Sequence, residues 1–188
     1  AALVSRVPQG LEDAPLLVVS DVLEGLEDLG RAARARSHAR IVAVTGSVGK
    51  TGTKEMLAAC LSALGKTVAT AGNLNNHIGA PLSLARLPQD CDFAVFELGM
   101  NHANEIRPLT RLVAPHATII TNVEPVHIEF FDGIDGIADA KAEILEGLEP
   151  GGVAVLNADN GSFGRLRARA RTLGVDRIVT FGQGATCD

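Results

Sequence analysis

Tryptophan and tyrosine are absent from this chain of 188 residues, and phenylalanine occurs only six times. Hydrophobic residues nevertheless make up 46% of the sequence. The core must therefore be built mainly from valine, isoleucine, leucine and alanine, which commonly fill buried parallel sheets. At this length we expect one domain or slightly more.

Cysteine is scarce, with three copies, and the odd number and the spacing exclude a disulfide framework and a zinc knuckle. Cys60 lies in an apolar helical run and Cys91 opens a strand, so both are predicted to be small buried side chains in a reducing cytosol. No signal peptide is expected from its first residues, and none of its apolar runs is long enough to span a bilayer. A cytoplasmic protein without a membrane partner is expected.

Positive charge is in deficit, since the formal net charge is −5. This balance argues against a nucleic-acid or membrane-surface binder. The one basic run, residues 31–40, is interpreted as the solvated face of a helix rather than as a nucleic-acid site.

The order of apolar runs predicts an α/β fold. Residues 1–20 look irregular, and a helix is expected over 22–37 with Leu23, Leu26, Leu29 and Ala33 on its apolar stripe. From residue 40 onward strands and helices alternate, which predicts a mostly parallel sheet with helices on both faces. The expected strands are 41–45, 67–70, 93–97, 118–122, 153–157 and 177–181, and the expected helices are 51–64, 82–86, 104–112 and 136–148.

Polar residues follow the predicted strands at their carboxyl ends. Glu97 ends the third strand, and Asn122 and Asn157 end the fourth and fifth. In open parallel sheets ligands bind at this edge, so the pattern locates a site before any family is considered.

A glycine-rich segment joins the first of these strands to a helix. It is shorter than the full G-x-x-x-x-G-K-[ST] pattern, because Val44 stands where the first glycine would be. Glycines let backbone N–H groups turn toward phosphate oxygens, and a helix N-terminus adds its positive end. Lys50 can reach the β- and γ-phosphates, and the Thr51 hydroxyl suits Mg²⁺. The predicted nucleotide-binding residues are Thr45, Gly46, Ser47, Val48, Gly49, Lys50, Thr51 and Gly52.

Three further residues have two open interpretations each. Glu97, across from the phosphate loop, suits Mg²⁺ binding, but a strand-end glutamate can also point to solvent. His127 lies just past the fourth strand as a site residue or a structural histidine. Lys141 lies early in a helix, where most lysines are solvated, and nothing in the pattern alone marks it as special.

These motifs together resemble the Mur ligases over residues 40–160. The similarity points to the branch that adds D-alanyl-D-alanine to UDP-N-acetylmuramoyl-tripeptide. It is carried by the phosphate loop and by Gly72-Asn73-Leu74-Asn75-Asn76-His77, Glu97-Leu98-Gly99-Met100-Asn101-His102, His127-Ile128-Glu129, Ala140-Lys141-Ala142-Glu143 and Leu156-Asn157-Ala158-Asp159. The resemblance implies a P-loop NTPase-like central domain, and a ligase that uses ATP to phosphorylate a substrate carboxylate before an amine attacks the acyl phosphate.

The resemblance also implies roles for single residues. Lys50 would hold phosphates, Thr51 and Glu97 one Mg²⁺, and His127 a second Mg²⁺, while Lys141 would carry a carbamate that binds metal. The expected catalytic residues are Lys50, Glu97, His127 and Lys141. Residues expected to line the muropeptide or phosphate side of the cleft are Asn73, Asn75, Asn76, Asn101 and His102.

Several positions depart from the family pattern. Gly52 replaces a common Ser or Thr, Asn104 a common Gly, and Glu124 and Phe130 replace small residues. By length, residues 1–39 are expected to be the tail of an N-terminal substrate domain and its connecting helix, and 40–188 a central domain without its C-terminal part. We therefore expect a fragment, monomeric, that binds ATP weakly and does not ligate alone.

Two other functions stay open. A different Mur ligase or a folylpolyglutamate synthase would share the loop and the lysine. A P-loop ATP-binding or hydrolysing module without amide chemistry would give Lys141 no special role.

Overall fold

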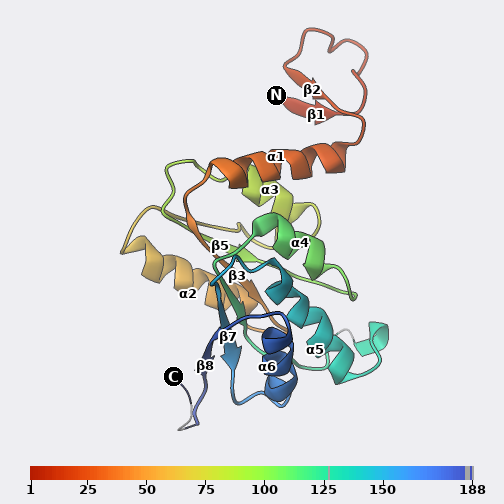
Figure 1. Ribbon diagram of the computed structural model, residues 1–188. Coiled ribbons are helices and arrows are strands. Elements are labelled where there is room, and N and C mark those ends of the chain that lie inside the picture. The colour runs from red at the N-terminus through yellow and green to blue at the C-terminus, as the bar shows by residue number, and fades with distance from the viewer. Residues whose placement is uncertain (127, 185–186, 188) are drawn as a thin grey trace.

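The computed structural model describes residues 1–126, 128–184 and 187. Two sheets are present (Figure 1). A two-stranded parallel sheet pairs β1 (Ala2–Val4) with β2 (Leu16–Val18). These strands correct the expectation that residues 1–20 are irregular.

The main sheet has six parallel strands in the order β4-β5-β3-β6-β7-β8. This confirms the predicted α/β class with a parallel sheet. The chain moves from β3 toward β4 on one side and later crosses to β6 on the other, so the order reverses next to β3. The strands are β3 (Arg40–Thr45), β4 (Thr67–Ala69), β5 (Phe93–Glu97), β6 (Ala117–Ile120), β7 (Val153–Asn157) and β8 (Arg177–Phe181).

Helices cover both faces of this sheet (Figure 1). Because parallel crossovers are right-handed, α2 lies on one face, and α3 to α6 lie on the other. The last helix of the chain was not predicted, since its arginine-rich sequence shows little apolar periodicity. The helices are α1 (Val22–Arg36), α2 (Lys50–Ser62), α3 (Gly79–Ala85), α4 (Ile106–Val113), α5 (Ile134–Ala142) and α6 (Phe163–Thr172), with 3₁₀ turns η1 (Ile128–Phe130) and η2 (Glu143–Gly147).

Helix α1 packs on α3 and α4 rather than on the sheet itself. Asp21 caps its N-terminus by accepting from the N–H groups of Leu23 and Glu24. The predicted stripe is only partly right. Ala33 is buried, but Leu23 and Leu29 are exposed. The prediction of a solvated basic face holds for Arg31, whereas Arg34 is half-buried and donates to the Val113 and Ala114 carbonyls.

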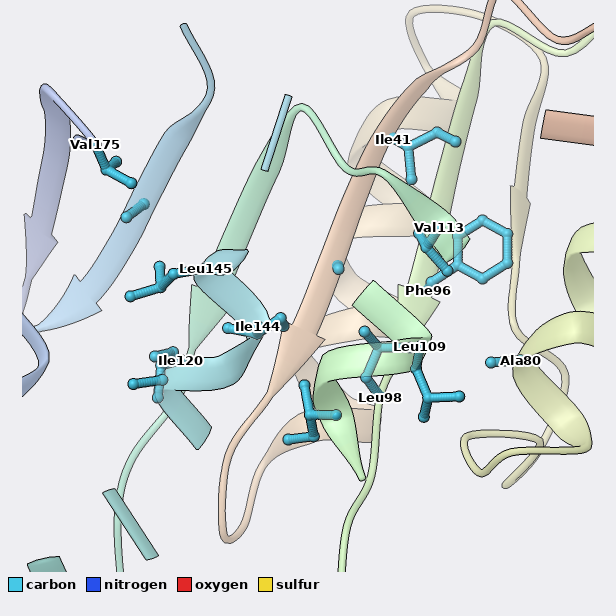
Figure 2. Close-up of a cluster of buried hydrophobic side chains, with 14 of the residues drawn as sticks. Ile41, Ala80, Phe96, Leu98, Leu109, Val113, Ile120, Ile144, Leu145 and Val175 are labelled. Atoms are coloured by element: carbon cyan, nitrogen blue, oxygen red, sulfur yellow. The ribbon is translucent and has the colours of Figure 1, made fainter. Parts of the chain in front are cut away.

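The core lies between the sheet and the α3 to α5 side, and it is aliphatic as the composition predicts. Figure 2 shows Ile41, Phe96, Ile120 and Ile144 pointing into this layer from both the strands and η2. Cys91 is buried as expected, but Cys60 is exposed on α2, so that part of the cysteine prediction is wrong. Cys60 lies on the outward side of α2, whereas Leu57, Ala58 and Leu61 of the same run are half-buried where the helix packs on β4 and β5.

Asn104 explains one departure from the family pattern. Its φ of 70° lies in the left-handed region, where glycine is favoured and asparagine is the next best tolerated residue. Its N–H donates to the buried Glu143 carboxylate at 2.6 Å. The same carboxylate accepts from Arg107 N at 3.0 Å, so it links η2 to the start of α4.

Candidate active site

The phosphate loop connects β3 to α2 at the carboxyl edge of the sheet. Gly49 has φ 82° and precedes the first residue of the helix, Lys50. The opening N–H groups of a helix have no partner inside it, so they are available to an anion. Gly46 has φ 151°, and a Cβ there would collide with Thr121 Oγ1. Both positions therefore require glycine for backbone conformation, and Gly46 also for space.

The segment after β6 holds this loop from the side. Asn122 accepts from Ser47 N through its carbonyl at 3.1 Å and from Val48 N through Oδ1 at 3.0 Å. Ser47 Oγ and Glu124 exchange two further hydrogen bonds. Two of the predicted phosphate-binding amides are thus already bonded within the protein, and Thr45 is completely buried. The amides of 49–51 are the better placed anion donors.

Lys50 lies back over the loop that precedes it. Its Nζ donates to Gly46 O at 2.8 Å and to Ser47 O at 3.3 Å. Burial lowers the pKa of this amine, while the Glu97 carboxylate opposes the shift. The ammonium group therefore has anionic and carbonyl neighbours at the mouth of the phosphate loop, which is where an incoming phosphate would compete for it.

Glu97 is buried, with 2% of its surface exposed, so the interpretation that it points to solvent is wrong. Thr51 Oγ1 donates to its Oε2 at 2.9 Å, and Asn75 Nδ2 donates to its Oε1 at 2.8 Å. The strand register puts Glu97 beside Val44, one residue before the end of β3. The hydroxyl of Thr51 and the carboxylate of Glu97 are hard oxygen donors brought together from two elements, as Mg²⁺ prefers.

Lys141 is only 3% exposed, so the alternative interpretation as an ordinary solvated lysine is wrong. Burial, together with the positive charge of Lys50, lowers its pKa from 10.5 to about 7. Its Nζ makes no hydrogen bond or ion pair with another residue in the described part of the chain. About half of such amines are neutral at pH 7, and a neutral amine is a nucleophile. His127, also predicted here, lies outside the described residues.

The predicted substrate residues divide into two groups. A pocket of about 480 Å³ is lined by Asn73, Asn75, Asn76 and Asn101 among others. Asn76 Oδ1 is also occupied with the N–H groups that begin α3. His102 is not in that lining, and its ring instead contacts Phe130, with 4.6 Å between centroids, and Glu105.

Sequence reasoning gave no individual role to three residues that build this site, although it placed Asn157 at this edge of the sheet. Thr121 faces Gly46 and donates to Val48 O at 2.7 Å. Asn157 donates to Thr121 O at 3.0 Å, so the Leu-Asn-Ala-Asp motif is hydrogen-bonded to the segment that follows β6. Lys54 is fully buried on α2. A lysine four residues after Lys50 shares its helix face, and this spacing was the signal that could have found it.

Comparison with known proteins relates this chain to a known family. The Mur ligase middle domain matches residues 44–188. The chain belongs to the Mur ligases. The match begins one residue before the end of β3 and includes the phosphate loop together with Thr121, Asn122 and Glu124, which hydrogen-bond to it.

Individual Mur ligases align over most of the chain. It is 47% identical over 163 residues to the UDP-N-acetylmuramoyl-tripeptide–D-alanyl-D-alanine ligase of Escherichia coli (strain K12), covering 87% of this chain and 36% of that protein. The crystal structure of MurF from Acinetobacter baumannii superposes with TM-score 0.87 at 38% identity, covering 97% of this chain and 39% of that one.

A MurF from Thermotoga maritima in complex with ADP has TM-score 0.82 and 27% identity, covering 97% of this chain and 42% of its own. The chain thus spans little more than a third of the length of the curated relatives it matches first. None of the helices in 1–126, 128–184 and 187 has the length and apolar character that a bilayer crossing requires.

Proposed function

We propose that this chain is the ATP-binding central part of a MurF-type ligase, which joins D-alanyl-D-alanine to UDP-N-acetylmuramoyl-tripeptide. The observation that carries the proposal is the convergence of Lys50, Thr51, Glu97 and Lys141 at one edge of the sheet. Curated relatives with this activity and a related MurF complex with ADP support it. Residues 1–39 then belong to the preceding substrate domain, and 40–188 to the central domain.

In this proposal the loop holds the nucleotide. The N–H groups of 49–51 and the ammonium of Lys50 bind the β- and γ-phosphates. Lys50 gives up its contacts with Gly46 O and Ser47 O in exchange for phosphate oxygens, which form stronger, charge-assisted bonds. The ordered loop, braced by Asn122, lowers the entropic cost of arranging these donors.

Thr51 and Glu97 fit a magnesium ion, and His127 is proposed for a second. The described residues contain no group of three His, Cys, Asp or Glu side chains that could hold a metal. This suits Mg²⁺, which binds through one or two carboxylates plus phosphates and water rather than in an all-protein cage. When bound, the ion neutralises charge between the anionic carboxylate substrate and the γ-phosphate.

Lys141 is proposed to carry a carbamate. Its neutral amine would attack the carbon of CO₂, so that an N–C bond forms while the electron pair of one C=O π bond moves onto that oxygen, and the nitrogen loses a proton to solvent. Burial without a partner in the described chain favours this neutral amine, as the pKa of about 7 indicates. The product is an anionic oxygen donor within electrostatic range of Lys50, which replaces repulsion between two cations with attraction.

The muropeptide side is assigned to the pocket that contains Asn73, Asn75, Asn76 and Asn101. Its amide groups can donate and accept hydrogen bonds, which suits neutral peptide and sugar groups. His102 is kept as a proposed contact at the rim, although its ring packs on Phe130. The γ-phosphate is transferred to the substrate carboxylate with release of ADP, and the amine then displaces phosphate from the acyl group.

The test is calorimetric titration of a non-hydrolysable ATP analogue with Mg²⁺ into the full-length ligase and into this chain, wild type against Lys50→Ala. Magnesium-dependent binding that Lys50→Ala abolishes is expected, together with ligation of D-alanyl-D-alanine only by the full-length protein. Full-length protein that does not bind the analogue would overturn the proposal.

A plain P-loop ATPase is the competing function. It needs no modified lysine, so ¹³C NMR after incubation with ¹³C-bicarbonate separates the two. A carbamate resonance that is lost in Lys141→Met supports the ligase, and turnover of ATP without an acyl acceptor supports the ATPase. Trials with different amine donors separate MurF from other Mur ligases and folylpolyglutamate synthases.

A further inference from the structure

Lys54 has a completely buried side chain, although neither a motif nor the proposed chemistry uses it. It lies on α2, three residues after Thr51. Burying an ammonium group is unfavourable unless polar partners compensate for the lost water. A buried lysine therefore needs hydrogen-bond acceptors close to its ammonium group. The identity of these acceptors shows which segment of the chain the lysine holds in place.

The ammonium group has three acceptors for its three N–H donors. Its Nζ donates to Thr70 O at 2.7 Å and to Gly72 O at 3.4 Å, and lies 3.0 Å from Glu55 Oε1. The two carbonyls belong to the segment that leaves β4 and enters the asparagine-rich loop of 73–76. Lys54 thus fastens the beginning of that loop to the phosphate-binding helix.

The same segment forms hydrogen bonds with Glu97 at two places, its backbone N–H and its carboxylate. Thr70 Oγ1 accepts from Glu97 N at 3.2 Å, and Asn75 Nδ2 donates to Glu97 Oε1 at 2.8 Å. Asn75 O also accepts from Gly99 N at 2.8 Å, just past the end of β5. The loop therefore hydrogen-bonds to one carboxylate oxygen of Glu97. The other oxygen, Oε2, accepts from Thr51 Oγ1 of α2 at 2.9 Å.

We propose that Lys54 is a positioning residue that fixes the 70–76 loop against α2 and so sets the orientation of the Glu97 carboxylate for a divalent cation. This rests on the proposed function, in which Glu97 binds magnesium. The phosphate contacts come from Lys50 and the backbone of the phosphate loop, to which Lys54 Nζ makes no hydrogen bond within the described part of the chain. Loss of Lys54 accordingly weakens binding of the metal more than binding of the nucleotide.

The experiment compares wild type, Lys54→Met and Lys66→Met in the full-length ligase. Methionine keeps the length of the side chain and removes its charge and donors. Lys66 is a matched control, since it is half-exposed, pairs with Asp90 at 2.6 Å, and precedes β4 at the opposite end of the sheet. Binding of the non-hydrolysable ATP analogue is titrated with and without Mn²⁺, and bound Mn²⁺ is measured directly by electron paramagnetic resonance.

We expect the Mn²⁺ affinity of Lys54→Met to fall about tenfold or more, the usual effect of removing a group that orients a metal ligand. Its metal-free affinity for the analogue and all values for Lys66→Met should match wild type. A purely structural role would lower the unfolding temperature but leave the ratio of affinities with and without metal unchanged. That unchanged ratio in folded Lys54→Met would overturn the inference and leave the proposed function standing.

Asn75→Ala provides a second route, because Asn75 is only half-buried and transmits the effect to Glu97. It should reproduce the loss of Mn²⁺ affinity, and the double variant should lose no more than the larger single loss. If Lys54→Met does not fold, an Asn75→Ala protein with wild-type metal affinity overturns the inference. Wild type that does not bind the analogue at all overturns the proposed function, and the inference with it.

Discussion

Asn122 joins the end of β6 to the phosphate loop by accepting from Val48 N through Oδ1, at 3.0 Å, and from Ser47 N through its backbone carbonyl, at 3.1 Å. The loop is therefore ordered by a neighbouring strand before any nucleotide arrives. Asn157 continues this bracing from β7, since it holds Thr121 O. The segments at the carboxyl ends of β6 and β7 thus brace the loop that follows β3.

Removing the Asn122 side chain should loosen the loop. Asn122→Ala leaves Val48 N without its acceptor, and we expect a stability loss of about 1 kcal/mol. Nucleotide affinity should fall severalfold, because the loop must then be ordered on binding. Hydrogen exchange of the amides of 46–49, followed by mass spectrometry, checks this. Equal exchange rates in Asn122→Ala and wild type would contradict it, and Gln9→Ala at an exposed position is the control.

Two glycines on either side of Lys50 should respond in opposite ways to alanine. Gly46→Ala introduces a Cβ against Thr121 Oγ1 at a φ of 151°, so we expect a loss of about 2 kcal/mol or more and loss of nucleotide binding. Gly52 lies within α2, and a Cβ added there would meet open space, so Gly52→Ala should stabilise the protein by about 0.5–1 kcal/mol. Urea unfolding of both variants measures the contrast, and a stable Gly46→Ala protein would refute it.

The buried amine of Lys141 should make stability depend on pH. Its pKa is about 7 in the folded protein, whereas the unfolded chain has the ordinary lysine value of 10.5. Between pH 7 and pH 10.5 the unfolded chain therefore binds one proton more than the folded protein at this amine. Wild-type stability therefore falls as pH decreases from 10.5 to 7 and levels off below that. This holds for unmodified protein, prepared without CO₂.

Lys141→Met removes this dependence on pH. The free energy of unfolding of the variant should therefore exceed that of wild type by a few kcal/mol at pH 7, and the two should become equal near pH 10.5. Chemical denaturation across this pH range is the measurement. Lys141→Arg, which keeps a positive charge throughout, should be destabilised at every pH. Parallel pH curves for wild type and Lys141→Met would exclude a buried, titrating amine.

Thiol reactivity should separate two cysteines that look alike in the sequence. Cys60 is exposed and should react with a thiol reagent within the folded protein, whereas burial raises the pKa of the Cys91 thiol and blocks access. Peptide mapping after brief labelling should find Cys60 modified, and Cys91 should react only after unfolding. Cys60→Ser should remove the fast phase at this site, and rapid labelling of Cys91 would contradict the structure.

Local sequence was sufficient for much of this protein. The β-branched runs predicted all six strands of the main sheet, because β-branched and apolar side chains favour strands both in its buried centre and at its less buried edges. The glycine and lysine spacing in 46–51 located the phosphate loop, because only certain residues permit that turn. The arginine-rich α6 and the short β1 and β2 escaped, since their stability comes from packing and strand pairing rather than from periodicity.

Tertiary structure alone decided the states of the charged residues. The sequence does not show whether Glu97, Lys54 and Lys141 are buried, yet each is at most 3% exposed. Burial and hydrogen bonds depend on which distant elements meet, as when residues 51 and 75 reach the two oxygens of Glu97. The sequence by itself determined the succession of strands and helices along the chain and the position of the phosphate loop. Only the folded arrangement, through desolvation and the neighbouring charge of Lys50, decided that the pKa of Lys141 is lowered to about 7.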